Sequence, residues 1–494
     1  MSGSTHTRLV AGVDSSTQSC TVVLRDAVSG ATVASGSSAH PPTTPPVSEQ
    51  DPSDWWTALT RAMSAALTSG EIDGSAVVAM SVAAQAHGLV VVDEAGQVIR
   101  PAKLWNDTTS AEQASRLVDR LGRDQWVQRC GSVPPAAFTI AKLAWLAEHE
   151  PDALARTAQV MVPADWLTWR LTGAAVTDAG DASGTGYFDP VRRRWDFGLL
   201  DLVDETRNWT SMLPKVLAHD EPAGTLTPST AQTLGLSPAT VVGPGTADNQ
   251  AAALGMGVLP GDVVVSLGTS GVVYACTTVP VVDLAGRING NADAAGGYLP
   301  VFCTLNAAKV TDMFARLLNV SHQELSDLAL AAPADDPERP VLAAFLDGER
   351  VPDRPSAVGT LSGLRSGTTR EQVARAAYEG VVAGLVGGID AFTGLGIRVD
   401  GRLAVTGGGA ASPAYRQLLA DLAGRPVYVV DEPQTAAAGA AVQAAAIVDG
   451  VEVHDLARRW APSWRVAATP RSGANRDELL DRFSRVVSWS GLEN

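Results

Sequence analysis

Short apolar runs separated by polar turns open the chain and recur near its middle. Residues 9–13 and 21–24 are apolar runs with hydroxyl and amide side chains between them, and residues 262–267 and 272–276 repeat this arrangement around a glycine-rich turn. Two β-rich runs joined by turn residues predict a β-hairpin in each place. A further run at 32–34 could extend the first hairpin to three antiparallel strands.

The two predicted hairpins can be compared residue by residue. When they are superimposed, Ser16-Thr17 falls on Gly268-Thr269. The match indicates either an internal duplication or two chance hairpins in an α/β protein. Under duplication we expect two similar domains with a catalytic cleft between them. Their expected bounds are 1–245 and 246–494, and the last helices could pack back on the first domain.

Strands and helices alternate through the rest of the chain. Apolar runs at 79–84 and 403–406 predict strands. Asp51-Pro52 is a helix-start signal, and Trp55, Leu59 and Met63 follow it at helical spacing. An alanine-rich stretch at 435–448 predicts a tightly packed helix. This alternation predicts an α/β fold.

The composition narrows the class of protein. The chain has 494 residues, of which 45% are apolar, enough for two or three domains with their own cores. Its 37 basic and 53 acidic residues give a net charge of −16. This balance argues against a nucleic acid or a membrane surface as partner, because both attract dense positive charge.

Cysteine usage and the apolar segments predict a cytoplasmic protein. The four cysteines, Cys20, Cys130, Cys276 and Cys303, are far apart and form no C-x-x-C pair, which is typical of buried thiols in a reducing compartment. Asp14 interrupts the first apolar run too early for a secretory signal. No run reaches the roughly 20 apolar residues that span a bilayer.

Four turns made of glycine or small hydroxyl residues each follow a predicted strand. They lie just after Asp14, at 243–245, at 268–271 and at 407–409. Small residues let backbone N–H groups approach an oxyanion closely, so such turns suit phosphate binding, although most glycine turns are purely structural. The chain has neither a G-x-x-x-x-G-K-[ST] motif nor H-R-D and D-F-G motifs. A P-loop enzyme and a protein kinase are therefore excluded.

A few polar and aromatic side chains at predicted strand ends could carry chemistry. Asp14 could hold Mg²⁺ against nucleotide phosphates, or it could cap its own turn. Asp248 could accept the proton of an attacking hydroxyl, or it could N-cap the next helix. His87 could bond a sugar hydroxyl or serve structure, and the segment 105–107 could form a carbohydrate-binding wall or a surface turn.

Two longer motifs point to a family. Residues 359–364 (GTLSGL), Gln372-Val373 and residues 376–379 (AAYE) fit the C-terminal signature of the FGGY sugar kinases at every defined position. A second signature is matched over 139–149 and departs only at Ala137, where a larger residue or glycine is usual. By these motifs nearly the whole chain resembles the FGGY carbohydrate kinases. The resemblance implies two actin/hexokinase-like (ribonuclease H-like) α/β domains.

Further motifs resemble the xylulokinase branch of that family. They are Ser48 to Pro52 with Trp55-Trp56, Gln85 to Gly88, Leu104 to Asp107, and Gly348 to Arg350. Glycerol kinases carry an Arg-Glu pair where this chain has Ala86-His87. The resemblance implies that ATP, with Mg²⁺, phosphorylates D-xylulose on its terminal 5-hydroxyl, and that a homodimer is a common assembly.

The resemblance also implies a role for each residue that matches a family motif. Asp248 would be the general base, and Asp14 would lie near Mg²⁺. The sugar-side residues would be Ala86, His87, Trp105, Asp107, Asp248 and Asn249. The nucleotide-side residues would be Thr17, Gly268, Thr269, Ser270, Gly407, Gly408, Gly409 and Ala410.

Three positions depart from the family pattern. Thr21 stands where Lys or Arg usually ends the first phosphate turn, Ser16 replaces Gly in that turn, and Ala86 replaces Met beside the histidine. Loss of the cation removes a charge-assisted contact to the transferred phosphoryl group, and Ala86 enlarges one wall of the sugar pocket. The alternatives are a kinase for another ketose or polyol (ribulose, gluconate or glycerol) and a sugar-binding sensor with weakened catalysis.

Overall fold

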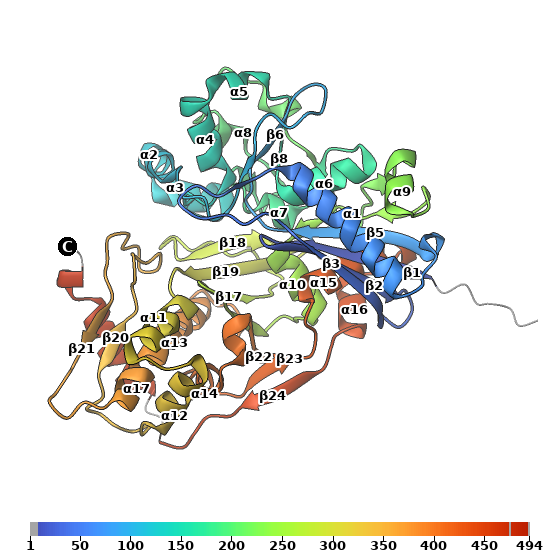
Figure 1. Ribbon diagram of the computed structural model, residues 1–494. Helices are drawn as coiled ribbons and strands as arrows, with labels where there is room; N and C mark the ends of the chain where they lie inside the picture. Colours follow the sequence, from blue (N-terminus) through green and yellow to red (C-terminus); the bar gives the residue numbers. More distant parts are fainter. Residues whose placement is uncertain (1–7, 474–475, 493–494) are drawn as a thin grey trace, which may run out of the picture. The chain divides into compact units, whose positions relative to one another are not determined.

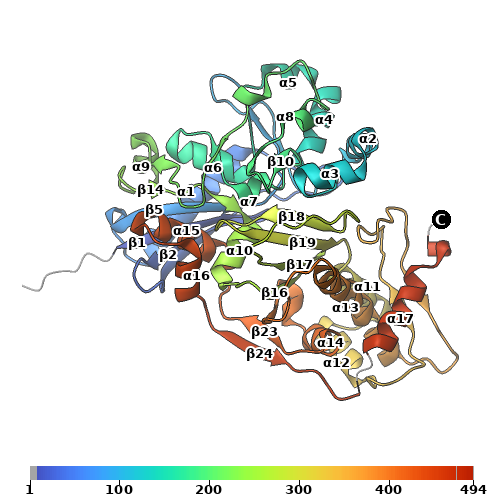
Figure 2. The ribbon, with the colours of Figure 1, turned by 180° about the vertical axis from the view of Figure 1, so that it is seen from behind.

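The computed structural model describes residues 8–473 and 476–492 (Figures 1 and 2). Its contacts group the chain into two compact units. Unit 1 comprises residues 1–258, 278–299 and 432–462, and unit 2 comprises residues 259–277, 300–431 and 463–494. The chain therefore returns to each unit after leaving it. The expected division into domains 1–245 and 246–494 stays a prediction, and its outermost residues lie outside the described part.

Unit 1 is built on a mixed sheet that begins with a three-stranded antiparallel meander. The meander is confirmed, with the third strand longer than expected, and strand β5 pairs in parallel with β1. The sheet has the order β13-β14-β5-β1-β2-β3. The strands are β1 (Leu9–Ser15), β2 (Ser19–Asp26), β3 (Thr32–Ala39), β5 (Val77–Ala84), β13 (Gly224–Thr225) and β14 (Val241–Val242), and β15 (Thr246–Ala247) also pairs with β5.

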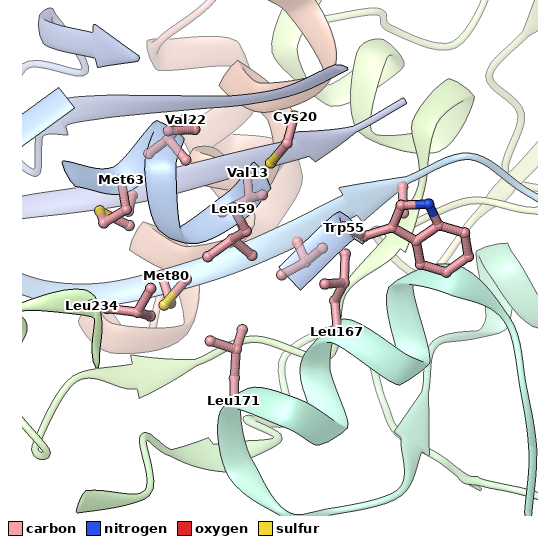
Figure 3. Packing of buried hydrophobic residues seen from close by; sticks show 14 of the residues in the cluster. Val13, Cys20, Val22, Trp55, Leu59, Met63, Met80, Leu167, Leu171 and Leu234 are labelled. Atoms are coloured by element: carbon pink, nitrogen blue, oxygen red, sulfur yellow. The ribbon is translucent and has the colours of Figure 1, made fainter. Parts of the chain in front are cut away.

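Residues of β1 alternate between the two faces of this sheet, and each face is covered by a helix. Ala11 and Val13 belong to the core that includes helix α1 (Pro52–Ser69), whereas Val10 belongs to the core that includes α15 (Thr435–Asp449). Figure 3 shows Val13, Leu59 and Met80 packed together in the first of these cores. Helix α1 starts as predicted, because the Asp51 carboxylate caps the N–H of Ser53.

Helix α15 lies so close to its neighbours that side chains are excluded at the contacts. A Cβ added to Gly12 of β1 would meet the carbonyl oxygen of Ala437 at 1.8 Å. Helix α10 (Asp248–Met256) crosses α15 with the same closeness, since a Cβ on Gly439 would lie 1.8 Å from the carbonyl oxygen of Ala251. The alanine-rich composition of α15 thus sets how near α10 comes to the sheet.

Unit 1 has a further apolar core, formed by residues that follow β5 in the chain, which includes Trp126, Phe138, Ile140 and Leu143. The other short strands of unit 1 are β4 (Glu49–Gln50), β6 (Val90–Val92), β7 (Ala102–Lys103), β8 (Gln159–Met161), β9 (Val176–Thr177), β10 (Phe188–Asp189), β11 (Arg194–Trp195), β12 (Lys215–Val216) and β18 (Ile288–Ala292). The other helices of unit 1 are α2 (Ala111–Leu121), α3 (Arg123–Cys130), α4 (Thr139–His149), α5 (Pro151–Arg156), α6 (Pro163–Thr172), α7 (Ala179–Ala182), α8 (Phe197–Leu200), α9 (Pro228–Leu234) and α16 (Val453–Arg459).

Unit 2 repeats the strand order of unit 1. A meander of β16, β17 and β19 is antiparallel, and β22 pairs in parallel with β16 as β5 does with β1. Its strands are β16 (Val263–Leu267), β17 (Gly271–Ala275), β19 (Tyr298–Thr304), β22 (Leu403–Thr406), β23 (Val427–Val430) and β24 (Trp464–Ala468), with the pair β20 (Val341–Ala343) and β21 (Thr360–Ser362) apart. The shared order supports the duplication and confirms two similar α/β domains.

Helices α11 to α14 gather beside the sheet of unit 2 (Figure 2). They are α11 (Ala308–Leu318), α12 (His322–Ala331), α13 (Arg370–Gly394) and α14 (Pro413–Ala423), with α17 (Arg476–Val487) near the C-terminus. Cys20, Cys130 and Cys276 are buried free thiols, and Cys303 is half-buried. Among residues 8–473 and 476–492, no helix is both long and apolar enough to cross a membrane.

Candidate active site

Asp14 lies near the end of β1, where the register of the sheet places several candidate residues in one row. It pairs with Thr21 on β2 and with Ala83 on β5, and Ala83 pairs in turn with Thr246 on β15. Strands are about 4.8 Å apart, so Asp14 lies about 10 Å from Thr246 across the sheet. Since Asp248 follows Thr246 by two residues, the two candidate carboxylates emerge at the same edge of the unit 1 sheet.

The carboxyl group of Asp14 is held by a neighbour that departs from the family pattern. The hydroxyl of Ser16 donates a hydrogen bond of 2.7 Å to Asp14 Oδ1. Burial raises the pKa of Asp14 to about 6, and this bond partly opposes the rise. Thr21, on the neighbouring strand, shares a 3.3 Å hydrogen bond with the hydroxyl of Ser37. Ser16 and Thr21, the two residues of the first phosphate turn that differ from the family pattern, therefore both contribute hydroxyl groups that make hydrogen bonds there.

Asp248 is the first residue of α10 and is half-buried. Its Oδ1 accepts hydrogen bonds from the backbone N–H and the side-chain amide of Asn249, at 2.7 and 3.0 Å. Burial, assisted by the negative charge of Asp14, raises the pKa of Asp248 to about 7. Ala247 occupies the N-cap position of the helix and no side chain caps it, so Asp248 is not the N-cap residue. A carboxylate whose pKa lies near neutrality is suited to general base catalysis.

A chain of side-chain hydrogen bonds links Thr17 to the predicted sugar wall. The indole N–H of Trp105 donates to the Thr17 hydroxyl at 2.9 Å, and this hydroxyl donates to Gln85 Oε1 at 3.2 Å. Gln85 continues to Gln50 Oε1 at 3.4 Å, which also accepts the indole N–H of Trp55. Gln50 and Gln85 both stand in the motifs that resemble xylulokinase, but the sequence alone does not predict that they connect these elements.

His87 has an unusual backbone conformation and several ring contacts. Its φ is +67°, a left-handed conformation that is uncommon for a residue other than glycine. The ring Nδ1 donates a 2.7 Å hydrogen bond to the carbonyl oxygen of Gly184, and the ring stacks on Phe138 with centroids 4.8 Å apart. Because a carbonyl only accepts, Nδ1 carries the hydrogen in this bond. Ala86 beside it is half-buried.

Asp107 has a structural position. Its side chain is fully buried, and its oxygens accept hydrogen bonds from the backbone N–H groups of Ser48 and Thr109, at 2.9 and 3.0 Å. Lys103 Nζ lies 3.4 Å from Asp107 Oδ1. These bonds hold the turn that carries Trp105, whose side chain remains exposed. Direct contact between Asp107 and a sugar stays a prediction, and one that these bonds do not favour.

Three further carboxyl groups are buried in unit 1 near Asp248. Asp165 and Asp178 accept hydrogen bonds, from the backbone of Val162 and from the hydroxyl of Thr246 respectively. Neither oxygen of Asp181 has a hydrogen-bond partner in the described structure. Burial and the negative charges of Asp165, Asp178 and Asp248 raise the pKa of Asp181 well above its usual value. Asp178 and Asp181 stand three residues apart in the sequence, but Asp165 and Asp248 are distant from them, so the sequence alone does not predict this cluster.

In unit 2 the turn 268–270 is tied to helix α11. The backbone N–H of Gly268 donates to the carbonyl of Ser270 at 3.1 Å, which tightens the turn, and Thr269 at its tip is exposed. The N–H groups of Ala307 and Ala308, at the start of α11, donate to the carbonyls of Thr269 and Gly268. The turn is therefore fixed to the helix that lines the neighbouring cavity.

A cavity of about 300 Å³ lies in unit 2 among α11, α12, α13 and the glycine-rich turn. Its lining includes Ala308, Thr311, Ser326, Tyr378, Gly408 and Gly409. Gly407, whose φ is +80°, turns the chain so that Gly408 to Ala411 form a short helical turn at the cavity. The Tyr378 ring lies edge-on to Tyr415, with centroids 4.6 Å apart. Tyr378 stands inside the C-terminal signature, but the signature alone does not predict that this ring lines a cavity.

The predicted site residues thus fall into two groups. Unit 1 holds Asp14, Thr17, Ala86, His87, Trp105, Asp107, Asp248 and Asn249, and unit 2 holds Gly268, Thr269, Ser270, Gly407, Gly408, Gly409 and Ala410. In the described part of the chain, no three His, Cys, Asp or Glu side chains gather to hold a metal ion by themselves. A single carboxylate such as Asp14 still fits Mg²⁺, which commonly keeps waters and binds substrate phosphates.

Comparison with known proteins agrees with this arrangement. Residues 9–255 match the N-terminal domain, and residues 263–447 the C-terminal domain, of the FGGY family of carbohydrate kinases. The chain is 43% identical over 484 residues to the xylulose kinase of Streptomyces rubiginosus, covering 97% of this chain and 96% of that protein. It is 42% identical over 483 residues to the xylulose kinase of Streptomyces coelicolor, with the same coverage.

A solved structure extends the agreement to three dimensions. The crystal structure of xylulose kinase from Bifidobacterium adolescentis matches with a TM-score of 0.85 at 33% sequence identity, covering 98% of this chain and 100% of that one. Sequence and fold therefore agree along the whole length. The chain belongs to the FGGY family of carbohydrate kinases.

Proposed function

We propose that the protein transfers the γ-phosphoryl group of ATP to the terminal 5-hydroxyl of D-xylulose. As a member of a kinase family it has ATP as a substrate, and identity of 42–43% with xylulose kinases over 97% of its length supports the choice of sugar. The observation that carries the chemistry is Asp248, a half-buried carboxyl group whose pKa is raised to about 7 at the edge of the unit 1 sheet.

Asp248 would act as the general base. Its carboxylate accepts the proton of the 5-hydroxyl while the oxygen attacks the γ-phosphorus, the bond from that phosphorus to the bridging oxygen of ADP breaks, and ADP leaves. The two donors from Asn249 both bind Oδ1, so Oδ2 is the oxygen assigned to the proton. Asn249 thereby orients the carboxylate.

The sugar would bind on unit 1. The ring of His87, which Gly184 holds through Nδ1, would contact a sugar hydroxyl. The Trp105 ring, 41% exposed and oriented by Thr17, offers an apolar wall for C–H groups. Ala86 and Ala137, both half-buried, leave room near His87.

ATP would bind on unit 2. The 300 Å³ cavity between Gly408-Gly409 and helices α11 to α13 has the size and the mixed lining of a small-ligand pocket, and we assign it to the adenosine. The turn Gly268 to Ser270 would receive phosphate oxygens through backbone N–H groups. Thr17 in unit 1 would assist on the side of the transferred group. Mg²⁺, held at Asp14, would neutralise phosphate charge.

The test is coupled ADP release with Mg²⁺-ATP against D-xylulose, L-xylulose, D-ribulose, L-ribulose, glycerol, gluconate and no sugar. A strong preference for D-xylulose supports the proposal. Preference for another compound of this panel would show that the protein is a kinase with a different substrate. Sugar binding by calorimetry without sugar-dependent turnover would instead favour the sensor, which the hydroxyl residues Ser16 and Thr21 of the first phosphate turn leave open.

The role of Asp248 has its own test. Asp248→Ala should reduce kcat by roughly 10²-fold or more, which is the size of a general base effect, while ADP binding by calorimetry stays nearly unchanged. Asp26→Ala, which removes a loop-capping carboxylate outside both residue groups, is the control and should retain wild-type kcat. A kcat of Asp248→Ala equal to that of the wild-type enzyme would show that Asp248 is not the general base. The homodimer and the cytoplasmic location stay predictions.

A further inference from the structure

Lys142 is a fully buried lysine in the first turn of α4. Burial disfavours its charge, and the N-terminal turn of a helix is an unfavourable place for a cation. Neither effect suits a residue whose only role is to fill the core. An apolar side chain of similar volume could fill the same space as the lysine stem. The presence of the amine is therefore to be explained by the groups that it contacts.

The Lys142 amine binds the backbone at two places on the predicted sugar wall. Nζ donates a 2.8 Å hydrogen bond to the carbonyl oxygen of His87 and a second hydrogen bond to the carbonyl oxygen of Ala137. The hydroxyl of Thr139 donates to the same His87 carbonyl at 3.1 Å. One amine therefore joins two segments that are 50 residues apart in the chain.

These contacts act on a residue whose conformation needs support. The left-handed backbone of His87 (φ +67°) is sparsely populated by residues with a side chain. With that backbone held, the ring reaches Gly184 through Nδ1 and lies parallel to Phe138. The helix that carries Lys142 begins directly after Phe138. The same helix end thus fixes the His87 carbonyl and supports its ring.

We infer that Lys142 is a positioning residue for sugar binding: its amine holds the carbonyls of His87 and Ala137 and so fixes the His87 ring in the orientation that receives the sugar. This inference rests on the proposed sugar site on unit 1. Lys142 does not contact the reacting atoms. It acts on the affinity for the sugar through His87, and it has no part in binding ATP.

The test compares Lys142→Met with Lys142→Gln in the full-length enzyme. Met keeps the volume of the stem and removes the donors, whereas Gln keeps a neutral donor group. Lys142→Met should raise KM for D-xylulose about tenfold, the scale expected for loss of two buried hydrogen bonds, and KM for ATP should stay within about twofold of wild type. Lys142→Gln should recover part of the lost sugar affinity.

Two further variants separate positioning from a general loss of stability. Thr240→Val removes another buried hydroxyl-to-carbonyl bond in unit 1, to Val77, and should leave KM for the sugar unchanged. In a His87→Ala background, Lys142→Met should change KM for the sugar by less than about twofold, because the ring that it orients is gone. Thr139→Val should raise KM in the same direction as Lys142→Met, by a smaller factor.

Three results would overturn the inference. They are an unchanged KM for the sugar in Lys142→Met, an equal rise in KM for ATP, and a tenfold effect that persists without the His87 side chain. If Lys142→Met does not fold, Lys142→Gln and Thr139→Val decide in its place. The panel assay of the wild-type enzyme tests the proposed function independently of these variants. If the wild-type enzyme binds or phosphorylates a sugar other than D-xylulose, KM of the variants is measured with that sugar.

Discussion

The indole N–H of Trp105 donates a 2.9 Å hydrogen bond to the hydroxyl of Thr17, a residue 88 positions earlier in the chain. Thr17 belongs to the turn after β1, and Trp105 to the turn that the buried Asp107 holds. The bond therefore connects the turn proposed for phosphate binding with the wall proposed for the sugar. Misplacement of the Trp105 ring should accordingly weaken binding of the sugar.

Trp105→Phe tests this connection, because it keeps an aromatic ring and removes the donor. The loss of one neutral hydrogen bond, about 0.5–1.5 kcal/mol, should raise KM for the sugar by roughly 2- to 10-fold. Thr17→Val should do the same, and the double variant should be no worse than the more affected single variant. Steady-state kinetics measures this, and fully additive effects would show that the two side chains act independently.

The contact between Gly439 and Ala251 sets the position of α10, and with it that of Asp248. Gly439→Ala places a Cβ 1.8 Å from the carbonyl oxygen of Ala251, so α10 must move. We expect a loss of roughly 1–3 kcal/mol of unfolding free energy, as for overpacking in general, together with a lower kcat. Urea titration and kinetics measure both.

The matched control for that variant is Gly384→Ala in α13. Apart from the adjacent backbone of α13 itself, nothing lies within 4 Å of a Cβ added there, and alanine favours a helix over glycine by up to about 1 kcal/mol. This substitution should leave stability unchanged or raise it, without an effect on kcat. A Gly439 variant as stable as wild type would mean that α10 and α15 tolerate a wider separation.

The unpartnered carboxyl group of Asp181 should make the folded state sensitive to pH. Its pKa is raised well above 3.8 in the folded state, so the folded protein holds a proton that the unfolded chain releases above its ordinary pKa. Stability contributed by this group therefore falls as pH rises above about 4. Asp181→Asn removes the titration, and its Tm relative to wild type should be higher at pH 8 than at pH 5.

Asp26→Asn is the control for this pH effect. Hydrogen bonds from Ser29 hold the pKa of Asp26 below its usual value, so the group is ionised at both pH values and the Tm difference should not depend on pH. A Tm difference for Asp181→Asn that is equal at pH 5 and pH 8 would show that Asp181 is ionised throughout.

Glu379 links two buried arginines in unit 2. Its carboxylate accepts hydrogen bonds from Arg375 Nε at 2.6 Å and from Arg339 Nε at 2.8 Å, and all three side chains are buried. Glu379→Gln leaves both guanidinium groups without their counter-charge, which should cost roughly 3–5 kcal/mol of unfolding free energy. Urea denaturation measures the loss.

An exposed ion pair in the same unit provides the comparison. Glu338 and Arg365 lie 3.6 Å apart, with more than 60% of each side chain exposed. Because water screens such pairs, Glu338→Gln should change stability by less than about 1 kcal/mol. If both variants lose the same small amount, the interior pair is better solvated than its burial indicates.

Local sequence patterns determined much of the fold. The hairpins, the helix start at Asp51 and the alanine-rich helix could be predicted because alternation, capping and composition are properties of neighbouring residues. The family motifs also drew attention to Asp14, His87 and Asp248. Each of these cues depends only on residues that are neighbours in the sequence, and such residues remain neighbours in the folded protein.

Tertiary structure alone decided which distant residues meet. The bond of Lys142 to the His87 carbonyl, the fit of Gly439 against Ala251 and the missing partner of Asp181 depend on how whole sheets and helices pack. Asp107 illustrates the difference, because the motif predicts a sugar contact and the fold places its carboxylate in a buried turn. Sequence thus determined the elements, and packing determined the neighbours of each functional side chain.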